Sequence, residues 1–266
     1  MTSRTIHGDV RGVPVAPLTL DGAADEVERW IADGEHGYAC LANVHVIETA
    51  RRDARLASAL TDATLVLPDG APVAWWLRRA IRADVRRLAG ADIFEELCRR
   101  SLASGHTHFF VGGTNDALER LRIALEETFP GIRIVGMQSP PFRAPTAEEE
   151  AELVTTINEA APDIVWVGLG APKQELWMAR NRPALDAPAL LGVGAVFDFA
   201  SGMRRRAPRW VQALALEWAY RLAQEPRRLW RRYLSTNTSF AIAASVEAAR
   251  RRPATGGNAH TARPVE

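Results

Sequence analysis

Short apolar segments alternate along the chain with segments in which apolar residues recur at helical spacing. The apolar segments predict six strands, at Tyr38–Asn43, Thr64–Pro68, Thr107–Gly112, Ile132–Gly136, Asp163–Gly168 and Ala189–Gly194. Between them, apolar residues three or four positions apart predict amphipathic helices, as at Leu118, Leu121 and Leu125. Strands that alternate with helices are typical of an α/β protein with a mostly parallel sheet covered on both faces.

The pattern changes after Gly202, where helical segments follow one another and no strand is predicted. The spacing of Trp210, Leu214, Trp218 and Leu222 predicts one helix. A second is expected from Pro226 to Leu234 and a third over about Phe240–Arg251. We therefore expect three parts: an α/β domain over residues 1–202, a basic helical appendage over 203–252 and a disordered tail over 253–266.

Polar residues that follow the predicted strands are the first candidates for a site, because ligands of parallel sheets bind beyond the carboxyl ends of the strands. Asn43 ends the first strand and precedes a helix, so capping that helix is an alternative explanation. Asp69 follows the second strand, between Pro68 and Gly70, where a general base could face the cleft. The alternative is a turn aspartate bonded to its own backbone.

Two glycine-containing turns are candidates for binding phosphate. Gly112 and Gly113 lie between a strand and a helix, where free backbone N–H groups suit an anion. The second turn reads Gly168-Leu-Gly170-Ala-Pro-Lys173-Gln174-Glu175, and Lys173 is the only lysine of the chain. We expect Lys173 to suit a diphosphate and Gln174 and Glu175 to bond sugar hydroxyls. The alternative is a capped helix with surface charges.

No pattern in the sequence predicts a dedicated metal or dinucleotide site. There is no Asp-x-Asp motif and no His/Cys cluster with ligand spacing. A G-x-G-x-x-G fingerprint and a Walker lysine are also absent. Arg87 and Asp92 place a cation and a carboxylate about a turn apart, with a salt bridge as the alternative. We interpret His36, His45, His106 and His108 as structural or solvated.

Composition and charge change the picture mainly near the C-terminus. The chain has 266 residues, of which 47% are hydrophobic and 24% charged, which excludes a mostly disordered or disulfide-scaffold protein. The net charge of +1 conceals nine arginines against two glutamates between Ser201 and Thr236. Trp210, Trp218 and Trp230 lie in the same segment. This segment predicts an anionic surface as partner, with a solvated helical face as the alternative.

The sequence also predicts where the protein acts. Its first residues contain no apolar signal-peptide core, and no stretch approaches the roughly 18 apolar residues of a membrane span. Cys40 and Cys98 show no metal or disulfide spacing and suit a reducing compartment. We therefore expect a cytosolic protein unless something holds it to a surface.

Nine segments, in order over about Thr5–Leu234, make the chain resemble the WecG/TagA/CpsF glycosyltransferases, glycosyltransferase family 26. They are Asn43 with its following helix, Leu-Pro-Asp69-Gly70, Arg87-x-x-Gly90-x-Asp92, Phe-Val-Gly112-Gly113, Ser-Pro-Pro-Phe142, Val-Gly-Leu-Gly-Ala-Pro-Lys-Gln-Glu175, Gly192-Val-Gly-Ala-Val-Phe-Asp198, Arg206-Ala-Pro-Arg-Trp210 and Glu217-Trp-Ala-Tyr-Arg-Leu-x-x-Glu-Pro-Arg227. The chain departs from some members at Leu41, where they carry a threonine.

The resemblance implies a Rossmann-like fold and an inverting transfer of a sugar, of N-acetylmannosamine type or another hexose. The implied donor is a UDP-sugar, and the implied acceptor is a polyprenyl diphosphate that already carries one sugar. The product would feed bacterial cell-surface polysaccharide, and Asp69 would be the base. Donor-binding residues are then expected at Asn43, Arg87, Asp92, Gly112, Gly113, Gly170, Lys173, Gln174 and Glu175.

The resemblance also gives the basic appendage a role in binding the acceptor and the inner face of the cytoplasmic membrane. Its expected residues are Arg206, Arg209, Arg221, Arg227, Arg228, Arg231 and Arg232, of which Arg221 and Arg227 would lie near the catalytic cleft. No cofactor, metal or nucleic acid is expected, and a homo-oligomer is left open. The competing interpretations are another nucleotide-dependent enzyme, such as a dehydrogenase, and a basic adaptor without catalysis.

Overall fold

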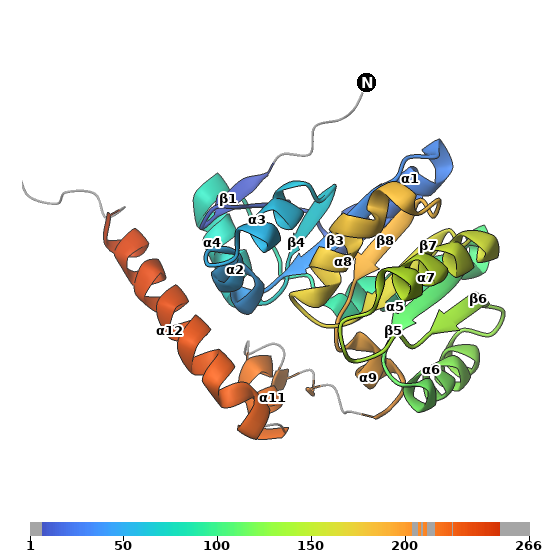
Figure 1. Ribbon diagram of the computed structural model, residues 1–266. Coiled ribbons are helices and arrows are strands. Elements are labelled where there is room, and N and C mark those ends of the chain that lie inside the picture. Colours follow the sequence, from blue (N-terminus) through green and yellow to red (C-terminus); the bar gives the residue numbers. More distant parts are fainter. Residues whose placement is uncertain (1–6, 204–206, 209, 212–215, 225, 251–266) are drawn as a thin grey trace, which may run out of the picture.

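Six parallel strands form one sheet at the centre of the protein, in the order β4-β3-β8-β7-β5-β6 (Figure 1). This computed structural model describes residues 7–203, 207–208, 210–211, 216–224 and 226–250. The strands are β3 (Gly37–Ala42), β4 (Leu65–Pro68), β5 (Thr107–Gly112), β6 (Arg133–Gln138), β7 (Ile164–Gly168) and β8 (Ala189–Gly192). All six predicted strands and the α/β class are therefore confirmed, with shifts of one or two residues at most ends.

Helices cover both faces of the sheet, because alternate side chains of each buried strand point to opposite faces. In β3, Cys40 belongs to one hydrophobic cluster and Ala39 and Leu41 belong to the other. The first cluster is covered by α2 (Val44–Ala50), α3 (Ala54–Thr61), α4 (Ala71–Ile81), α7 (Ala147–Ala160) and α8 (Lys173–Asn181), which a short 3₁₀ turn (Arg182–Ala184) follows. The second is covered by α1 (Leu20–Asp33), α5 (Gly90–Ser104), α6 (Asn115–Thr128) and α9 (Val196–Ala200).

A small antiparallel hairpin precedes the sheet and was not predicted. It pairs β1 (Gly8–Val10) with β2 (Val13–Val15), and Arg11 and Gly12 turn the chain with φ of 57° and 91°. Strands of three residues are too short for an alternating pattern to be recognised, so the sequence signal was lost. The hairpin packs beside α4, where the side chains of Leu77 and Ile81 lie against Gly8.

The C-terminal helices are α11 (Glu217–Gln224) and α12 (Pro226–Arg250), and α12 runs past α2 at the left of Figure 1. The prediction of two helices separated near residues 235–239 is wrong, because α12 is continuous. Ser, Thr and Asn are poor helix formers, but tertiary contacts override that preference here. Thr236 is buried, and Ser239 bonds Glu48 of α2. The expected tail, 253–266, lies outside the described residues, as does Leu214 of the first predicted stripe.

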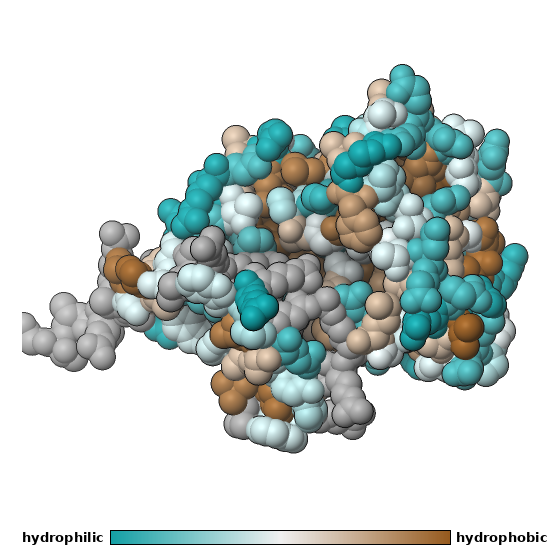
Figure 2. Space-filling view, turned by 60° about the horizontal axis from the view of Figure 1, so that its bottom comes forward, coloured by the Kyte–Doolittle hydropathy of each residue, from teal (hydrophilic) through white to brown (hydrophobic). Residues whose placement is uncertain are grey.

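Apolar side chains are exposed on this C-terminal part. Trp210 is 65% exposed, Trp218 44% and Trp230 47%. Figure 2 shows brown surface among the C-terminal helices, at the left and the bottom of the view. Within the described residues, none of the helices combines the length and the apolar character needed to cross a bilayer.

His108 illustrates a polar residue that belongs to the core. It is fully buried in β5 and its ring stacks on Trp166, whose indole N–H donates to His108 Nδ1 at 3.0 Å. Burial lowers the pKa of His108 to about 4, so the ring is neutral near pH 7. The interpretation of His108 as structural is confirmed.

Candidate active site

A cavity of about 1340 Å³ opens at the carboxyl ends of the strands. Its wall includes residues that directly follow β3, β4, β5, β7 and β8, together with the loop after β6. Residues of α11 and α12 also border it, so the cavity lies between the sheet and the C-terminal helices. This is the edge at which sheets of this kind bind ligands.

Asn43 and Asp69 meet on the wall of this cavity. Asn43 Oδ1 accepts hydrogen bonds from the backbone N–H groups of His45 and Val46, at 3.1 and 3.2 Å, and so caps α2. Its Nδ2 donates to Asp69 Oδ2 at 3.2 Å. The side chain of Asn43 therefore caps α2, as the alternative interpretation predicted, and also orients the carboxylate of Asp69.

The backbone around Asp69 aims this carboxylate at the cavity. The Asp69 N–H donates to the carbonyl of Ala42 at 3.1 Å, which continues the pairing of β3 with β4 by one residue. Gly70 then turns with φ of 92°, and α4 begins at Ala71. Asp69 is half-buried and borders the cavity, a placement that a general base requires.

The two contacts of Asn43 can be separated experimentally. Asn43→Ser should keep the helix cap, because serine is a strong N-cap residue, but should remove the amide that donates to Asp69. We expect kcat to fall by about tenfold, the effect of losing one hydrogen bond to a charged group. Thermal unfolding should stay near that of the unchanged protein. Unchanged turnover would show that Asn43 only caps the helix.

The glycine turns bring bare backbone to the cavity. Gly112 and Gly113 have φ of 128° and 75°, a region that favours glycine, and Gly113 borders the cavity. The hydroxyl of Ser139 donates to the Gly113 carbonyl at 2.7 Å, which ties the loop after β6 to this turn. Gly170 also has a positive φ, 77°, and borders the cavity beside α8.

Positive charge gathers at the same edge. Lys173 is exposed, borders the cavity and reaches the carbonyl of Phe142 at 3.4 Å. The first residues of α4, α5 and α8 also line the cavity, and the N-terminus of a helix carries partial positive charge. The arrangement suits a diphosphate that crosses from one turn to the next.

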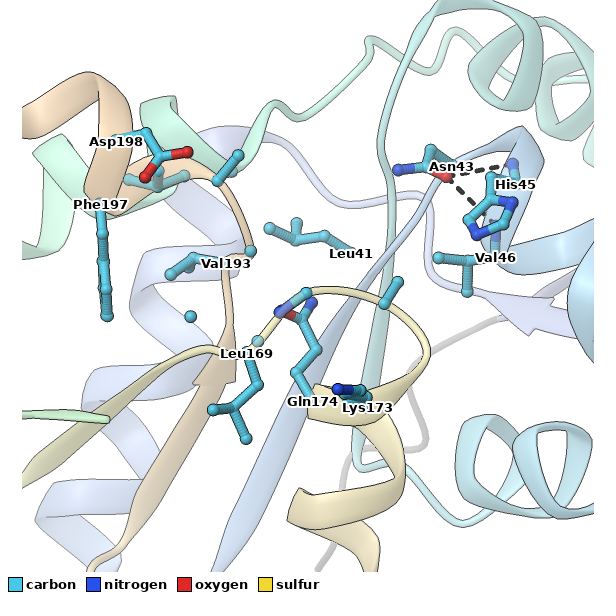
Figure 3. Close-up of a pocket in the computed structure, with 18 of the residues that line it drawn as sticks. Leu41, Asn43, His45, Val46, Leu169, Lys173, Gln174, Val193, Phe197 and Asp198 are labelled. Atoms are coloured by element: carbon cyan, nitrogen blue, oxygen red, sulfur yellow. Dashed lines mark hydrogen bonds between the residues drawn. The ribbon is translucent and has the colours of Figure 1, made fainter. Parts of the chain in front are cut away.

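Gln174 and Glu175 are more deeply buried than residues expected to bond sugar hydroxyls. Gln174 is 3% exposed; its Oε1 accepts from the Gly170 N–H at 3.2 Å and its Nε2 donates to Glu175 at 2.9 Å. Glu175 is fully buried and does not border the cavity. In Figure 3, Gln174 and Lys173 lie at the start of α8, with Asn43 and His45 to one side and Asp198 to the other. In this arrangement Glu175 contacts Gln174, which braces the Gly170 turn.

Arg87 joins the cavity to the C-terminal helices. Its guanidinium donates to Glu217 of α11 at 3.1 Å, and both residues border the cavity. Asp92 lies in the first turn of α5 and, like Gly112, does not border it. The structure thus brings the expected base, Asp69, and six of the nine expected donor residues to the wall of one cavity: Asn43, Arg87, Gly113, Gly170, Lys173 and Gln174. The other three, Asp92, Gly112 and Glu175, do not border it.

The expected arginines of the appendage are only partly described. Arg206 and Arg209 lie outside the described residues, and so do the side chains of Arg221, Arg228, Arg231 and Arg232. Arg227, near the start of α12, is exposed and does not border the cavity.

Two residues of the cavity wall were missed by the sequence reasoning. His45 was interpreted as structural or solvated, but it borders the cavity two residues after Asn43 (Figure 3). Asp198, at the start of α9, borders it after β8. Both could have been found from their location in the sequence, because each belongs to the first turn of a helix that follows a parallel strand.

The described residues hold no group of three or more His, Cys, Asp or Glu side chains that could bind a metal ion. The wall of the cavity supplies a carboxylate, a lysine, backbone amides and helix N-termini. This combination suits proton removal beside an anionic leaving group.

Comparison with known families agrees with this chemistry. The sequence model of the glycosyl transferase WecG/TagA/CpsF family matches residues 9–254. The chain belongs to this family. It is therefore a glycosyltransferase, from a family that acts in cell-surface polysaccharide synthesis with a nucleotide-sugar donor and a lipid-linked acceptor. Because the match runs through α12, the WecG/TagA/CpsF pattern includes the C-terminal helices as well as the sheet.

Proposed function

We propose that this glycosyltransferase moves a hexose, of N-acetylmannosamine type or another kind, from a UDP-sugar to a polyprenyl-diphosphate-linked acceptor, with inversion. The observation that carries the proposal is the carboxylate of Asp69. Asn43 orients it at 3.2 Å, on a cavity whose wall also carries Lys173 and the glycine turns. One base and one diphosphate site are what a single-displacement transfer requires.

The proposed step needs no group beyond those at the cavity. An acceptor hydroxyl oxygen forms a bond to the anomeric carbon while its proton passes to Asp69. The bond from that carbon to the β-phosphate oxygen breaks, and UDP leaves with the electron pair. Lys173 and the helix N-termini offset the charge that develops on the diphosphate. Attack opposite the leaving group inverts the configuration.

A donor screen tests the proposed function. Purified protein is given UDP-, GDP- and ADP-sugars together with a synthetic prenyl diphosphate that carries GlcNAc, and products are identified by mass spectrometry. The configuration of the new linkage follows from NMR. In parallel, UDP but not NAD should raise the melting temperature. Stabilisation by NAD, or transfer from GDP- or ADP-sugars alone, would contradict the proposal.

We expect transfer to survive EDTA. The reason is that the cavity already supplies positive charge to the diphosphate, through Lys173 and the first turns of α4, α5 and α8. Initial rates with and without chelator should agree within about twofold, a free-energy difference of less than about 0.5 kcal/mol. A large loss that Mg²⁺ or Mn²⁺ restores would show that a metal balances the leaving-group charge.

We also propose that the C-terminal helices hold the enzyme on the anionic inner face of the cytoplasmic membrane. Trp210 and Trp218 are both exposed, so these helices do not bury their tryptophans against the core. Trp230, Ile242 and Val246 are exposed on α12 as well. Exposed tryptophans together with arginines are typical of surfaces that rest on a bilayer.

Vesicle pelleting tests this membrane role. The protein should pellet with vesicles of phosphatidylcholine and phosphatidylglycerol at low salt and be released by salt, because each basic residue near such a surface contributes about 1 kcal/mol that salt screens. Trp218→Ser with Trp230→Ser should weaken pelleting. Ile123→Ser is the matched control, since Ile123 is exposed to the same 44% as Trp218 but lies on α6. Equal loss in the control, or no pelleting at all, would contradict the role.

A further inference from the structure

A buried charged cluster joins α12 to the core of the protein. We call it the Glu48 cluster; it consists of Arg11, Glu48, Ser239 and Phe240. Glu48 of α2 is fully buried, and its Oε1 lies 2.6 Å from Nε of Arg11, in the turn of the β1–β2 hairpin. Its Oε2 accepts the hydroxyl of Ser239 at 2.7 Å and a guanidinium N–H of Arg51, in the turn after α2, at 3.2 Å. The cluster thus ties together three segments that are far apart in the sequence.

Aromatic rings complete the surroundings of Arg11. Its guanidinium carbon lies 5.7 Å from the ring centroid of Trp76 and 6.0 Å from that of Phe240. The two rings are themselves 5.4 Å apart, and Phe240 is buried. Such contacts favour a cation over an aromatic face. Arg11 therefore contacts α12 through Phe240 and contacts α2 through Glu48.

Burying a carboxylate between two helices carries a large desolvation penalty, which is offset only when its oxygens have hydrogen-bonding or charged partners. An apolar contact could stabilise the packing of α12 equally well, but it would permit more orientations of this helix. Both contacts form only when Ser239 faces Oε2 of Glu48 and Phe240 lies over the guanidinium of Arg11. This geometry fixes both the rotation of α12 about its axis and its position along α2.

The same stretch of α12 forms a wall of the cavity. Asn237, Ala241 and Ala244 border it at positions i, i+4 and i+7, which is one face of a helix, and Phe240 borders it beside them. None of these four carries a charge. The groups that suit a diphosphate come from the core, so the face of α12 suits the uncharged part of a substrate that follows its diphosphate, such as the first isoprene units of a lipid-linked acceptor.

We propose that Glu48 is a positioning residue for the acceptor: through Ser239 and Phe240 it holds α12 in the place where this helix forms the acceptor side of the cavity. The part of this proposal that concerns the acceptor rests on the proposed function. The docking of α12 does not, because it can be measured without any substrate. Glu48 itself does not border the cavity.

The test removes the contribution of α12 and leaves the Arg11–Glu48 pair in place. In Ser239→Ala, hydrogen exchange of the amides of residues 236–244 should accelerate by about tenfold, the effect of one lost bond to a charged group. Amides of β3 and β7 should keep their protection. Ser239→Thr, which retains the hydroxyl, should restore slow exchange. Ser245→Ala is the matched control, since the Ser245 hydroxyl bonds only within α12, to the Ala241 carbonyl at 2.9 Å.

Kinetics then separate positioning from mere docking. With the prenyl-diphosphate-GlcNAc acceptor, Ser239→Ala should raise the acceptor KM by about tenfold, while kcat and the Kd of UDP stay within about twofold. Phe240→Ala should act in the same direction, with Ile123→Ala, at an exposed apolar residue of α6, as its control. Unchanged exchange in Ser239→Ala would overturn the docking role, and faster exchange with an unchanged acceptor KM would overturn the positioning role. If the unchanged enzyme transfers to no lipid diphosphate, the proposed function fails, while the exchange result still decides the docking role.

Discussion

Replacing Asp69 by asparagine should abolish sugar transfer and leave UDP binding almost intact. The amide has nearly the shape of the carboxylate but cannot accept the proton of the acceptor hydroxyl. Loss of a general base lowers turnover by about 10²–10⁴-fold. The phosphate-binding groups lie on other strands and turns, so the Kd of UDP should change by less than about threefold, under 1 kcal/mol. Turnover by product formation and UDP affinity by calorimetry measure the two effects.

A matched control is available just before the opposite end of the same strand. Asp62 precedes β4 at its opposite end, where its carboxylate accepts the Ser58 hydroxyl at 3.0 Å and is exposed. Asp62→Asn makes the same chemical change at the amino end of the strand and should leave turnover unchanged. Near-normal turnover in Asp69→Asn would remove Asp69 from its assigned role. A parallel loss of UDP affinity would place Asp69 at the donor instead.

Gly112→Ala should produce the second large effect, on folding and on UDP binding together. A Cβ at this position would lie 2.7 Å from the backbone carbon and oxygen of Gly168, and φ of 128° is unfavourable for any other residue. Backbone cannot move aside as a flexible side chain can, so β5 and β7 would have to separate. We expect the free energy of unfolding to fall by about 3–5 kcal/mol, from overpacking and backbone strain together.

Gly131 separates these two causes. It has a positive φ of 96°, but a Cβ there would meet no atom within 4 Å. Gly131→Ala should therefore cost only the conformational strain, about 1–2 kcal/mol. Chemical denaturation gives both values, and UDP affinity should fall in Gly112→Ala alone because the Gly113 and Gly170 turns would be displaced. Equal destabilisation in the two variants would show that β5 and β7 tolerate the extra carbon.

Five of the six strands could be predicted because each is a short apolar run that is almost entirely buried, and burial on both faces requires such a run. The edge strand β6 is only partly buried, and both of its predicted ends were displaced. The candidate site could be predicted in part for the same reason, since a strand boundary marks the residues that reach the cavity edge. The rule succeeded for Asn43 and Asp69. It was not applied to His45 and Asp198, which also follow strands. It misplaced Glu175, because a residue one position further along α8 than Gln174 points into the core.

The sequence by itself determined the class of fold, the location of the strands to within two residues, the location of Asp69 in a turn and the membership of a glycosyltransferase family, because each depends on neighbouring residues or on motifs in order. Only the tertiary structure decided how one part of the chain meets another. Asn43 reaches Asp69 from 26 positions away, Arg87 meets Glu217 from 130, and Ser239 meets Glu48 from 191. Contacts over such separations have no local pattern, and for that reason the continuity of α12 and its place on the cavity wall could not be predicted from its Ser- and Thr-rich sequence.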